Sequence, residues 1–330
     1  MKRSISIIGA GNVGTAFAAM LSHHKRPVKI YCIERDVEDD INCRRINSKY
    51  LHGVKLPPNV SATASIKESL EGADIVIVAV PRFALPEVYA AAAPHIASDS
   101  AIGVLTKGLD QHTGEPAALS FARLLPPRLR KRIVMIGGPA IANELAGNTP
   151  AGIILGGKNK DAVHTLKRAL ESKTVKVATS SDIVGVSYAM ALKNVYAIAL
   201  GMCDGLGYAT NTKALIITLA IQELREVLPK LGGHAETAIT LAGIGDIFVS
   251  GVSAHGRNRT FGERLVSAKT RDPVSLGLGT VEGIEAAKAV RNILSKKKIR
   301  APLIKTVAQC LSATSDFERP LIKFIERLAL

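Results

Sequence analysis

The hydrophobic pattern of this chain changes character near residue 180. Before that point, short apolar runs alternate with amphipathic stretches of helical length. The runs that predict strands after the first one lie at 28–33, 73–81, 100–106, 132–136, 152–155 and 175–178. A strand that is apolar throughout is typical of a parallel sheet with both faces covered. We therefore predict a Rossmann-like, doubly wound α/β domain over residues 1–180.

The remainder of the chain has a different period. From about Asp182, alanine, leucine, isoleucine and methionine recur at helical spacing, glycine-rich turns interrupt them, and no run predicts a strand. This pattern predicts a mostly α-helical C-terminal domain over residues 181–330.

The first apolar run leads into three glycines with the spacing G-x-G-x-x-G and then into an alanine-rich helical segment. Gly9 permits the tight turn, Gly11 lets the backbone approach a pyrophosphate, and Gly14 lets the helix pack closely on the strand. Asn12 and Val13 lie where the free N–H groups and the positive dipole end of the helix favour phosphate. Strand, turn and helix in this order predict a dinucleotide cofactor.

Two neighbouring charges at the end of the second predicted strand bear on the choice of cofactor. Glu34 lies twenty residues beyond Gly14, where an acid accepts the adenosine ribose hydroxyls and favours NAD. Arg35 follows at once, and an arginine there can hold the 2′-phosphate of NADP. The two signals oppose each other, so the sequence predicts NAD or NADP, with NAD slightly favoured.

The formal net charge of +15 comes from 43 Lys and Arg residues against 28 Asp and Glu residues. The basic residues are spread along the chain, and only six tyrosines, seven phenylalanines and no tryptophan are available to stack on bases. We therefore expect no nucleic-acid partner and interpret the charge as a field that attracts anionic metabolites.

We predict no signal peptide, integral membrane segment or metal site. The chain opens on cations that lead directly into the first strand. Its most apolar stretch, 183–206, is interrupted by Lys193, Asn194 and Asp204. Its four cysteines are scattered, with no metal-ligand spacing. We expect a soluble, cytoplasmic protein.

Polar residues interrupt apolar sequence at two places that could carry chemistry. Lys107 follows a predicted strand at its carboxyl end, where open α/β sheets bind their ligands. Lys193 and Asn194 occupy the middle of an apolar helix, where an unpaired charge is costly, so this lysine needs a carboxylate partner or a site facing water. The alternatives are a solvent-facing lysine at the strand end and a lysine that extends along its helix to reach water.

A third polar cluster is framed by glycines. Asp246 can orient a lysine, Ser250 follows it in the sequence, and Arg257 with Asn258 can hold a phosphate through several hydrogen bonds. A solvated turn is the alternative for the second pair, but the glycines on both sides favour an anion site.

Together these motifs resemble the NAD(P)-dependent glycerol-3-phosphate dehydrogenase family over nearly the whole chain. The matching segments are 9–15, Leu51-His52-Gly53 with Leu56-Pro57, Lys107-Gly108, Gly137-Gly138-Pro139, 191–195, Gly245-Asp246, 256–262 and Val281-Glu282-Gly283. Eight motifs in register are specific, although each alone is weak.

The resemblance implies reversible reduction of dihydroxyacetone phosphate to sn-glycerol 3-phosphate, which supplies the backbone for phospholipid synthesis. It implies that the domain over residues 181–330 binds substrate and carries catalytic residues. It also implies that Lys193 is the proton donor, that Asn194 and Asp246 hold it in place, and that Lys107 polarises the substrate. The implied substrate-binding residues are Lys107, Gly138, Asp246, Ser250, Arg257 and Asn258. The implied cofactor-binding residues are Gly9, Gly11, Asn12, Val13, Gly14, Glu34, Arg35, Lys107, Ala142, Arg257 and Glu282.

Two positions depart from the family pattern, and alternative functions follow from the fold. Ala140 stands where many members have serine or threonine, and Gly256 stands where bacterial members often have serine. The alternatives are a related reductase of the 2-ketopantoate or 3-hydroxyacid type and a non-enzymatic NAD(H) sensor. For the family member, a homodimer is expected.

Overall fold

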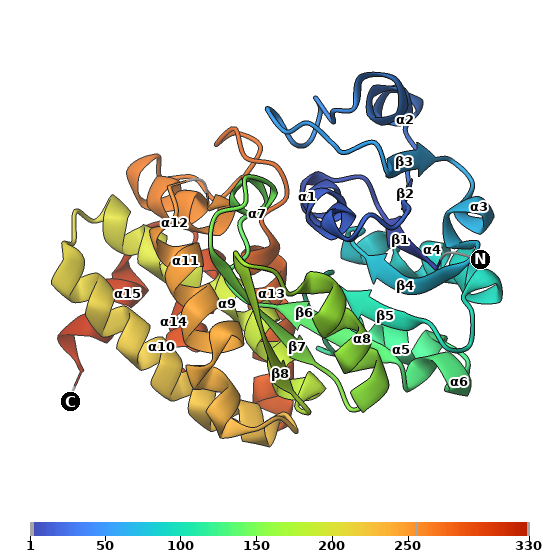
Figure 1. Ribbon diagram of the computed structural model, residues 1–330. Helices are drawn as coiled ribbons and strands as arrows, with labels where there is room; N and C mark the ends of the chain where they lie inside the picture. The colour runs from blue at the N-terminus through green and yellow to red at the C-terminus, as the bar shows by residue number, and fades with distance from the viewer. Residues whose placement is uncertain (1–2, 255, 329–330) are drawn as a thin grey trace. The chain divides into compact units, whose positions relative to one another are not determined.

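The chain folds into two compact units, which are described here from a computed structural model covering residues 3–254 and 256–328 (Figure 1). The first unit comprises Met1–Lys107 and Ala117–Ile183, and the second comprises Gly108–Pro116 and Val184–Leu330. The segment 108–116 therefore groups with the helical part, although the sequence-based division at residue 180 places it in the first domain. Its Gln111 side chain hydrogen-bonds Glu285, and Gly114 lies against Ile293.

The first unit is built on one sheet whose strands are ordered β3-β2-β1-β4-β5-β6-β7-β8. Their bounds are β1 (Ser4–Ile8), β2 (Val28–Tyr31), β3 (Val60–Thr63), β4 (Ala73–Val78), β5 (Ala101–Val104), β6 (Ile133–Gly137), β7 (Ala151–Gly156) and β8 (Val175–Ser180). All neighbouring strands are parallel except β6 and β7. Every residue of β1 and β5 is buried, as their apolar sequences require.

Helices cover the faces of this sheet. They are α1 (Asn12–Leu21), α2 (Arg35–Asp39), α3 (Ile66–Leu70), α4 (Leu85–Ala92), α5 (Ala117–Leu124), α6 (Pro127–Arg130), α7 (Ala142–Ala146) and α8 (Lys160–Leu170). Two local features account for helix α8. The Asn159 side chain accepts a hydrogen bond from the Ala162 N–H at its N-terminus, and buried residues recur every three to four positions. The predicted doubly wound α/β class is confirmed.

The second unit is helical, and the structure describes no strand in it. Its α-helices are α9 (Ile183–Gly205), α10 (Thr210–Lys230), α11 (Asp246–Val252), α12 (Arg257–Ser267), α13 (Glu282–Lys296), α14 (Pro302–Ser312) and α15 (Arg319–Glu326). α9 is long and apolar enough to cross a membrane, but 89% of its most apolar window is buried within the fold. It is the core helix of this unit.

Glycines let α12 approach this core helix closely. A Cβ at Gly201 would lie 1.9 Å from the Arg259 carbonyl oxygen, and one at Gly262 would lie 2.1 Å from the Ile198 carbonyl oxygen. Either methyl group would force the two helices apart, so the contact depends on glycine from both sides. This close contact fixes α12 beside the part of α9 that carries the polar residues.

The strand predictions differ from the structure mainly at the ends. The run at 28–33 forms a strand only to Tyr31, and Ile33 is exposed. The short strand β3 is not predicted by the pattern, because Val60–Thr63 is only half apolar. The segment 42–58, predicted as a loop or short helices, begins inside a π-helical turn (Asp40–Arg44) and is otherwise irregular.

Candidate active site

The central feature of the helical unit is a buried lysine held between two groups of one short helix. Lys193 of α9 is 7% exposed, and its Nζ donates to Asp246 Oδ1 at 2.6 Å and to Ser250 Oγ at 2.7 Å. Asp246 and Ser250 are one turn apart on α11 and therefore face the same way. The carboxylate, itself 2% exposed, compensates the ammonium charge where water is largely excluded.

The glycine-rich segment before α11 explains how Asp246 reaches this position. A π-helical turn, Leu241–Gly245, runs directly into α11 at Asp246. A Cβ at Gly243 would lie 2.0 Å from the Ala238 carbonyl oxygen, so only glycine lets the chain fold this tightly. The Gly-Ile-Gly-Asp motif thus has a steric cause as well as a chemical one.

A second hydrogen-bonded group joins three helices beside the lysine. Asn194 of α9 donates from Nδ2 to Glu282 Oε2 of α13 at 3.1 Å. The Gly283 backbone N–H donates to Asn258 Oδ1 of α12 at 2.8 Å. A Cβ at Gly283 would lie 2.7 Å from the Asn194 carbonyl oxygen, which accounts for the glycine of the Val-Glu-Gly motif. Lys193, Asn194, Asp246, Ser250, Asn258 and Glu282 are therefore brought together in one unit.

The two arginines around Asn258 have different environments. Arg257 is the first residue of α12, is exposed, and has no side-chain partner among the described residues. Arg259 instead donates to the Ser253 carbonyl oxygen at 3.1 Å and pairs with Asp204 at 2.5 Å and Glu263 at 3.0 Å. Arg259 therefore stabilises the fold, while Arg257 at a helix N-terminus is available to an anion.

The dinucleotide turn of the first unit has the geometry that its glycines predict. Gly9 has φ +113°, and a Cβ at Gly14 would lie 2.0 Å from the Gly9 carbonyl oxygen. A Cβ at Gly11 would meet no described atom within 4 Å, so this backbone is open to a ligand. α1 begins at Asn12 with no acidic residue in its first turn, so no carboxylate of that turn competes for its free N–H groups. These residues fit a dinucleotide pyrophosphate.

The other predicted residues of this unit lie beyond the carboxyl ends of parallel strands. Glu34 and Arg35 follow β2, Lys107 follows β5, and Gly138 follows β6 with φ +108°. Ala142 is buried at the start of α7, which contacts α1. This is the edge at which open α/β sheets bind ligands, and the strand order reverses between β1 and β4 beside the glycine turn.

Three residues that the sequence did not single out, Asn47, Lys49 and Tyr50, lie beside the glycine turn or contact Glu34. Asn47 Nδ2 donates to the Ala10 carbonyl oxygen and to Thr15 Oγ1, both at 2.8 Å, and so fastens its loop to the glycine turn. Lys49 and Tyr50 both contact the Glu34 carboxylate. Their only sequence signal is that they belong to the irregular segment that follows the second strand.

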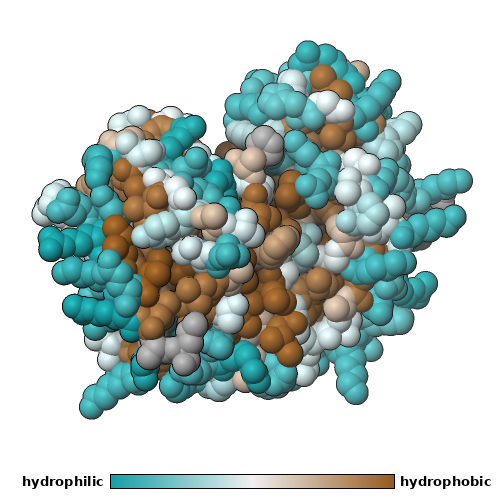
Figure 2. Space-filling model, turned by 90° about the vertical axis from the view of Figure 1, so that its left-hand side faces the viewer, coloured by the Kyte–Doolittle hydropathy of each residue, from teal (hydrophilic) through white to brown (hydrophobic). Residues whose placement is uncertain are grey.

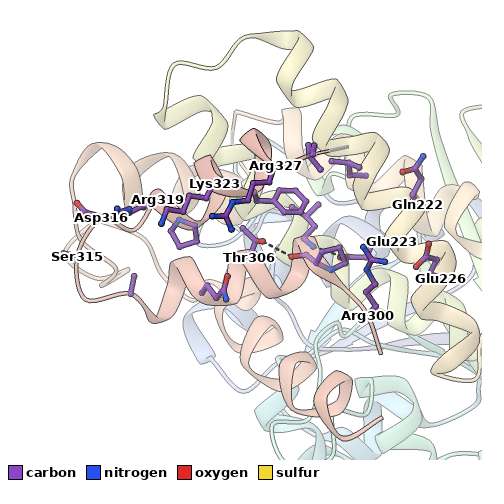
Figure 3. Close-up of a pocket in the computed structure, with 18 residues that line it drawn as sticks. Gln222, Glu223, Glu226, Arg300, Thr306, Ser315, Asp316, Arg319, Lys323 and Arg327 are labelled. Atoms are coloured by element: carbon purple, nitrogen blue, oxygen red, sulfur yellow. Dashed lines mark hydrogen bonds between the residues drawn. The ribbon is translucent and has the colours of Figure 1, made fainter. Parts of the chain in front are cut away.

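A cavity of about 950 Å³ in the helical unit lies apart from the predicted site residues (Figure 3). It is lined by α10, α14 and α15 and the turns beside them, and Glu223 forms part of its wall. None of the predicted site residues is among those that line it. This cavity is therefore not the candidate site.

Comparison with known proteins identifies relatives along the whole chain. Residues 4–163 match the NAD-dependent glycerol-3-phosphate dehydrogenase N-terminus, and residues 182–321 match its C-terminus. A glycerol-3-phosphate dehydrogenase (NAD(P)+) of Bacillus velezensis is 33% identical over 310 residues, covering 94% of this chain and 90% of the relative. One of Clostridium botulinum is 31% identical over 313 residues, 94% of each chain.

A solved structure extends this similarity to the fold. The crystal structure of glycerol-3-phosphate dehydrogenase from Coxiella burnetii superimposes with a TM-score of 0.89 at 30% identity, covering 99% of both chains. The agreement spans both units rather than the dinucleotide-binding unit alone.

Proposed function

This chain belongs to the NAD-dependent glycerol-3-phosphate dehydrogenase family, and from that premise we propose that it reversibly reduces dihydroxyacetone phosphate to sn-glycerol 3-phosphate. The observation that carries the proposal is the buried contact of Lys193 with Asp246 and Ser250. A lysine kept charged inside an apolar helix is a proton donor placed where charge can be stabilised.

In this proposal the nicotinamide cofactor, when bound, supplies the hydride. The Lys193 ammonium gives its proton to the ketone oxygen as negative charge develops there, and it takes the proton back in the reverse direction. Asp246 favours the charged lysine, and Ser250 restricts where its Nζ points. Asn194 is held by Glu282, which keeps the neighbouring turn of α9 in place.

Arg257 is proposed to bind the substrate phosphate together with Asn258. A guanidinium matches phosphate oxygens bidentately, and the N-terminus of α12 adds backbone N–H groups from the same side. Lys107 and Gly138 are proposed as further substrate residues on the family resemblance alone. Gly256 and Ala140 lack the hydroxyls common in the family, so backbone N–H groups carry more of the phosphate contact.

NAD or NADP is the cofactor, and the residues proposed to bind it are those that the glycine turn and the family resemblance indicate. The pyrophosphate is assigned to the turn of Gly9, Gly11 and Gly14, with Asn12 and Val13 at the start of α1. The adenosine ribose is assigned to Glu34 and Arg35. Ala142, Lys107 and Arg257 are proposed as further cofactor contacts, and Glu282 as a contact near the nicotinamide ribose.

The test is oxidation of NADH and NADPH, followed at 340 nm, with dihydroxyacetone phosphate and with dihydroxyacetone. We expect turnover with the phosphorylated ketone. Arg257→Leu raises KM for it by about tenfold or more, because one charge-assisted contact is lost. Arg291→Leu, which removes an exposed arginine with no described partner on α13, is the matched control and changes KM less than twofold. Absence of turnover despite cofactor binding would contradict the proposal.

The alternatives are not favoured. Arg257 is exposed at a helix N-terminus and has no side-chain partner in the part of the chain that the structure describes, which suits a phosphorylated substrate better than a 2-ketopantoate or 3-hydroxyacid substrate. A sensor of NAD(H) needs no buried proton donor such as Lys193. Both halves of the chain match the dehydrogenase family, so the resemblance is not confined to cofactor binding.

We further propose a cytoplasmic homodimer whose product serves phospholipid synthesis. The half-buried residues Leu215, Ile217, Leu219 and Ile221 make α10 apolar on several sides, which is typical of a helix that is covered. Figure 2, viewed from the side of α10 and α15, shows apolar side chains at the surface among charged ones. Sedimentation equilibrium should give a dimer at micromolar concentration and a monomer for Leu215→Lys/Ile221→Lys; a monomeric parent protein would contradict this.

A further inference from the structure

Lys49, which is not among the predicted site residues, binds the carboxylate of Glu34, which is expected to contact the adenosine ribose. Lys49 Nζ donates to Glu34 Oε1 at 2.5 Å and to Asp36 Oδ2 at 3.2 Å. The Tyr50 hydroxyl donates to Glu34 Oε2 at 2.9 Å. Both oxygens of the Glu34 carboxylate therefore already accept a hydrogen bond, and one of the donors is a cation.

The loop that carries this lysine is fixed to the dinucleotide turn. Asn47, which is buried, donates to the Ala10 carbonyl oxygen and to Thr15 Oγ1, and its own Oδ1 accepts from the Tyr50 N–H at 3.1 Å. Leu51 is buried directly after these residues. Lys49 thus comes from an anchored segment beside the phosphate-binding backbone.

The charge balance around Glu34 differs from that of a simple NAD site. A lone carboxylate after the second strand accepts the ribose hydroxyls and repels a 2′-phosphate. Here Lys49 stands against that carboxylate, and Arg35, on the adjacent residue, is exposed without a described partner. The bonds to Glu34 and Asp36 raise the pKa of Lys49 above its usual value, so its charge persists across the working pH range.

We propose that Lys49 is a cofactor-specificity residue, which by binding the Glu34 carboxylate lets the ribose subsite accept a 2′-phosphate, so that NADPH and NADH are both bound. The inference rests on the proposed function for its cofactor class. With NADPH, the 2′-phosphate dianion competes with Glu34 for the Lys49 ammonium and is met by Arg35, and lysine and arginine are both established phosphate ligands. With NADH, the ribose hydroxyls donate to the Glu34 carboxylate.

A structural role for the same ion pair makes a different prediction. The Lys49 and Glu34 side chains are 44% and 33% exposed, and such a pair contributes little to folding stability. Removing Lys49 is therefore expected to leave the melting temperature within about two degrees of the parent value while changing cofactor choice. A lower melting temperature with an unchanged preference between NADPH and NADH would show that Lys49 has only a structural role.

The test compares equilibrium binding of NADPH and NADH to Lys49→Met and Lys55→Met, measured by nucleotide fluorescence or calorimetry without substrate. Lys55 lies in the same segment, is exposed and has no described partner, so its replacement controls for the loss of one positive charge. For Lys49→Met we expect the ratio Kd(NADPH)/Kd(NADH) to rise about tenfold. For Lys55→Met we expect a change in that ratio of less than twofold.

Two further arms make the result decisive. Glu34→Gln should move the ratio in the opposite direction, because it removes the charge that repels the 2′-phosphate. Adenosine 2′,5′-bisphosphate and AMP should repeat the pattern of the two dinucleotides, since they differ only by the 2′-phosphate. An unchanged ratio in Lys49→Met, or the same change in Lys55→Met, would overturn the inference.

These binding measurements also separate the inference from the proposed reaction. If the protein binds both dinucleotides and the ratio shifts, but dihydroxyacetone phosphate is not reduced, the proposed function fails and the inference stands. If the protein binds neither dinucleotide, both fail.

Discussion

Two buried carboxylates contact the same helix of the second unit, but they have different kinds of partner. Asp246 meets Lys193 of α9 at 2.6 Å. Glu223, 6% exposed, accepts from the Tyr196 hydroxyl of α9 at 3.2 Å and from the backbone N–H groups of Leu303 and Ile304 at 2.6 and 3.1 Å. The first is paired with a charge, and the second with neutral donors.

The partners decide what each carboxylate does. Glu223 satisfies the N-terminus of α14, where Pro302 takes the first position and N–H groups would otherwise be unpaired. Burial raises the pKa of Glu223 to about 7, although its N–H donors act in the opposite sense. Asp246 instead keeps a cation in a nearly dry place. Near α9, one buried carboxylate thus completes a helix N-terminus and the other holds the proposed proton donor.

The largest effect is expected when the pair of Lys193 and Asp246 is broken. Lys193→Met removes the proposed proton donor and should lower kcat by about 10²–10⁴-fold, the usual contribution of a positioned acid. Steady-state rates with dihydroxyacetone phosphate test this, and NADH binding shows that the first unit is intact. Lys213→Met removes a lysine that pairs with Asp204 at 2.7 Å outside the site, and should retain most of the activity. Equal losses in the two variants would contradict a catalytic Lys193.

Removing the anion of the same pair should mainly cost stability. Asp246→Asn leaves the Lys193 ammonium buried without a countercharge, a change that typically destabilises by about 3–5 kcal/mol. Urea unfolding measures the loss. The double variant Lys193→Met/Asp246→Asn should lose less than the two single losses added together, because the charges compensate each other. Strict additivity would show that the pair is not coupled.

We expect Glu223 to affect the pH dependence of folding stability rather than the rate of turnover. Since its pKa in the folded protein is about 7 and its ordinary value is 4.5, the folded state binds the proton more tightly than the unfolded chain. Its stabilising contribution is therefore complete below pH 4.5 and is lost as the pH rises to about 7, a loss of about 3 kcal/mol.

Glu223→Gln cannot ionise, so its free energy of unfolding should fall less steeply than that of the parent protein between pH 5 and pH 7. Glu87→Gln, at an exposed position on α4 of the first unit, is the matched control and should keep the parent slope. Urea unfolding at pH 5, 6, 7 and 8 makes the comparison. A parent slope in Glu223→Gln would show that Glu223 ionises normally in the folded state.

Local patterns predicted the fold better than they predicted the partners in the site. The glycine turn at residues 9–14 could be predicted from the spacing of its glycines. The parallel strands could be predicted because burial on both faces leaves a continuous apolar run. Strand β3 was not, since Ser61 is exposed and interrupts a strand of only four residues. A lysine inside apolar α9 signalled that a countercharge was needed, but the contact between Lys193 and Asp246 spans 53 residues and depends on how α11 packs.

The same limit explains why Lys49 was missed. Nothing in its neighbourhood distinguishes it from Lys55 of the same segment, and both are exposed. What singles out Lys49 is a contact with Glu34 across fifteen residues, which arises only when the Asn47 side chain fastens the loop to the glycine turn. Contacts of this kind depend on tertiary structure rather than on composition or period.

The smallest expected effect concerns the neutral link of the second carboxylate to α9. Tyr196→Phe removes one hydrogen bond of 3.2 Å to Glu223 and should lower stability by about 1 kcal/mol, with kcat changed less than twofold. Tyr188→Phe, on the same helix and buried but with no hydrogen bond described for its hydroxyl, is the control. Glu223 keeps its two backbone donors in the variant, so α14 should remain capped. A large loss of kcat in Tyr196→Phe alone would mean that the two carboxylates are coupled through α9, three residues from Lys193, and that the division between a structural and a catalytic carboxylate is wrong.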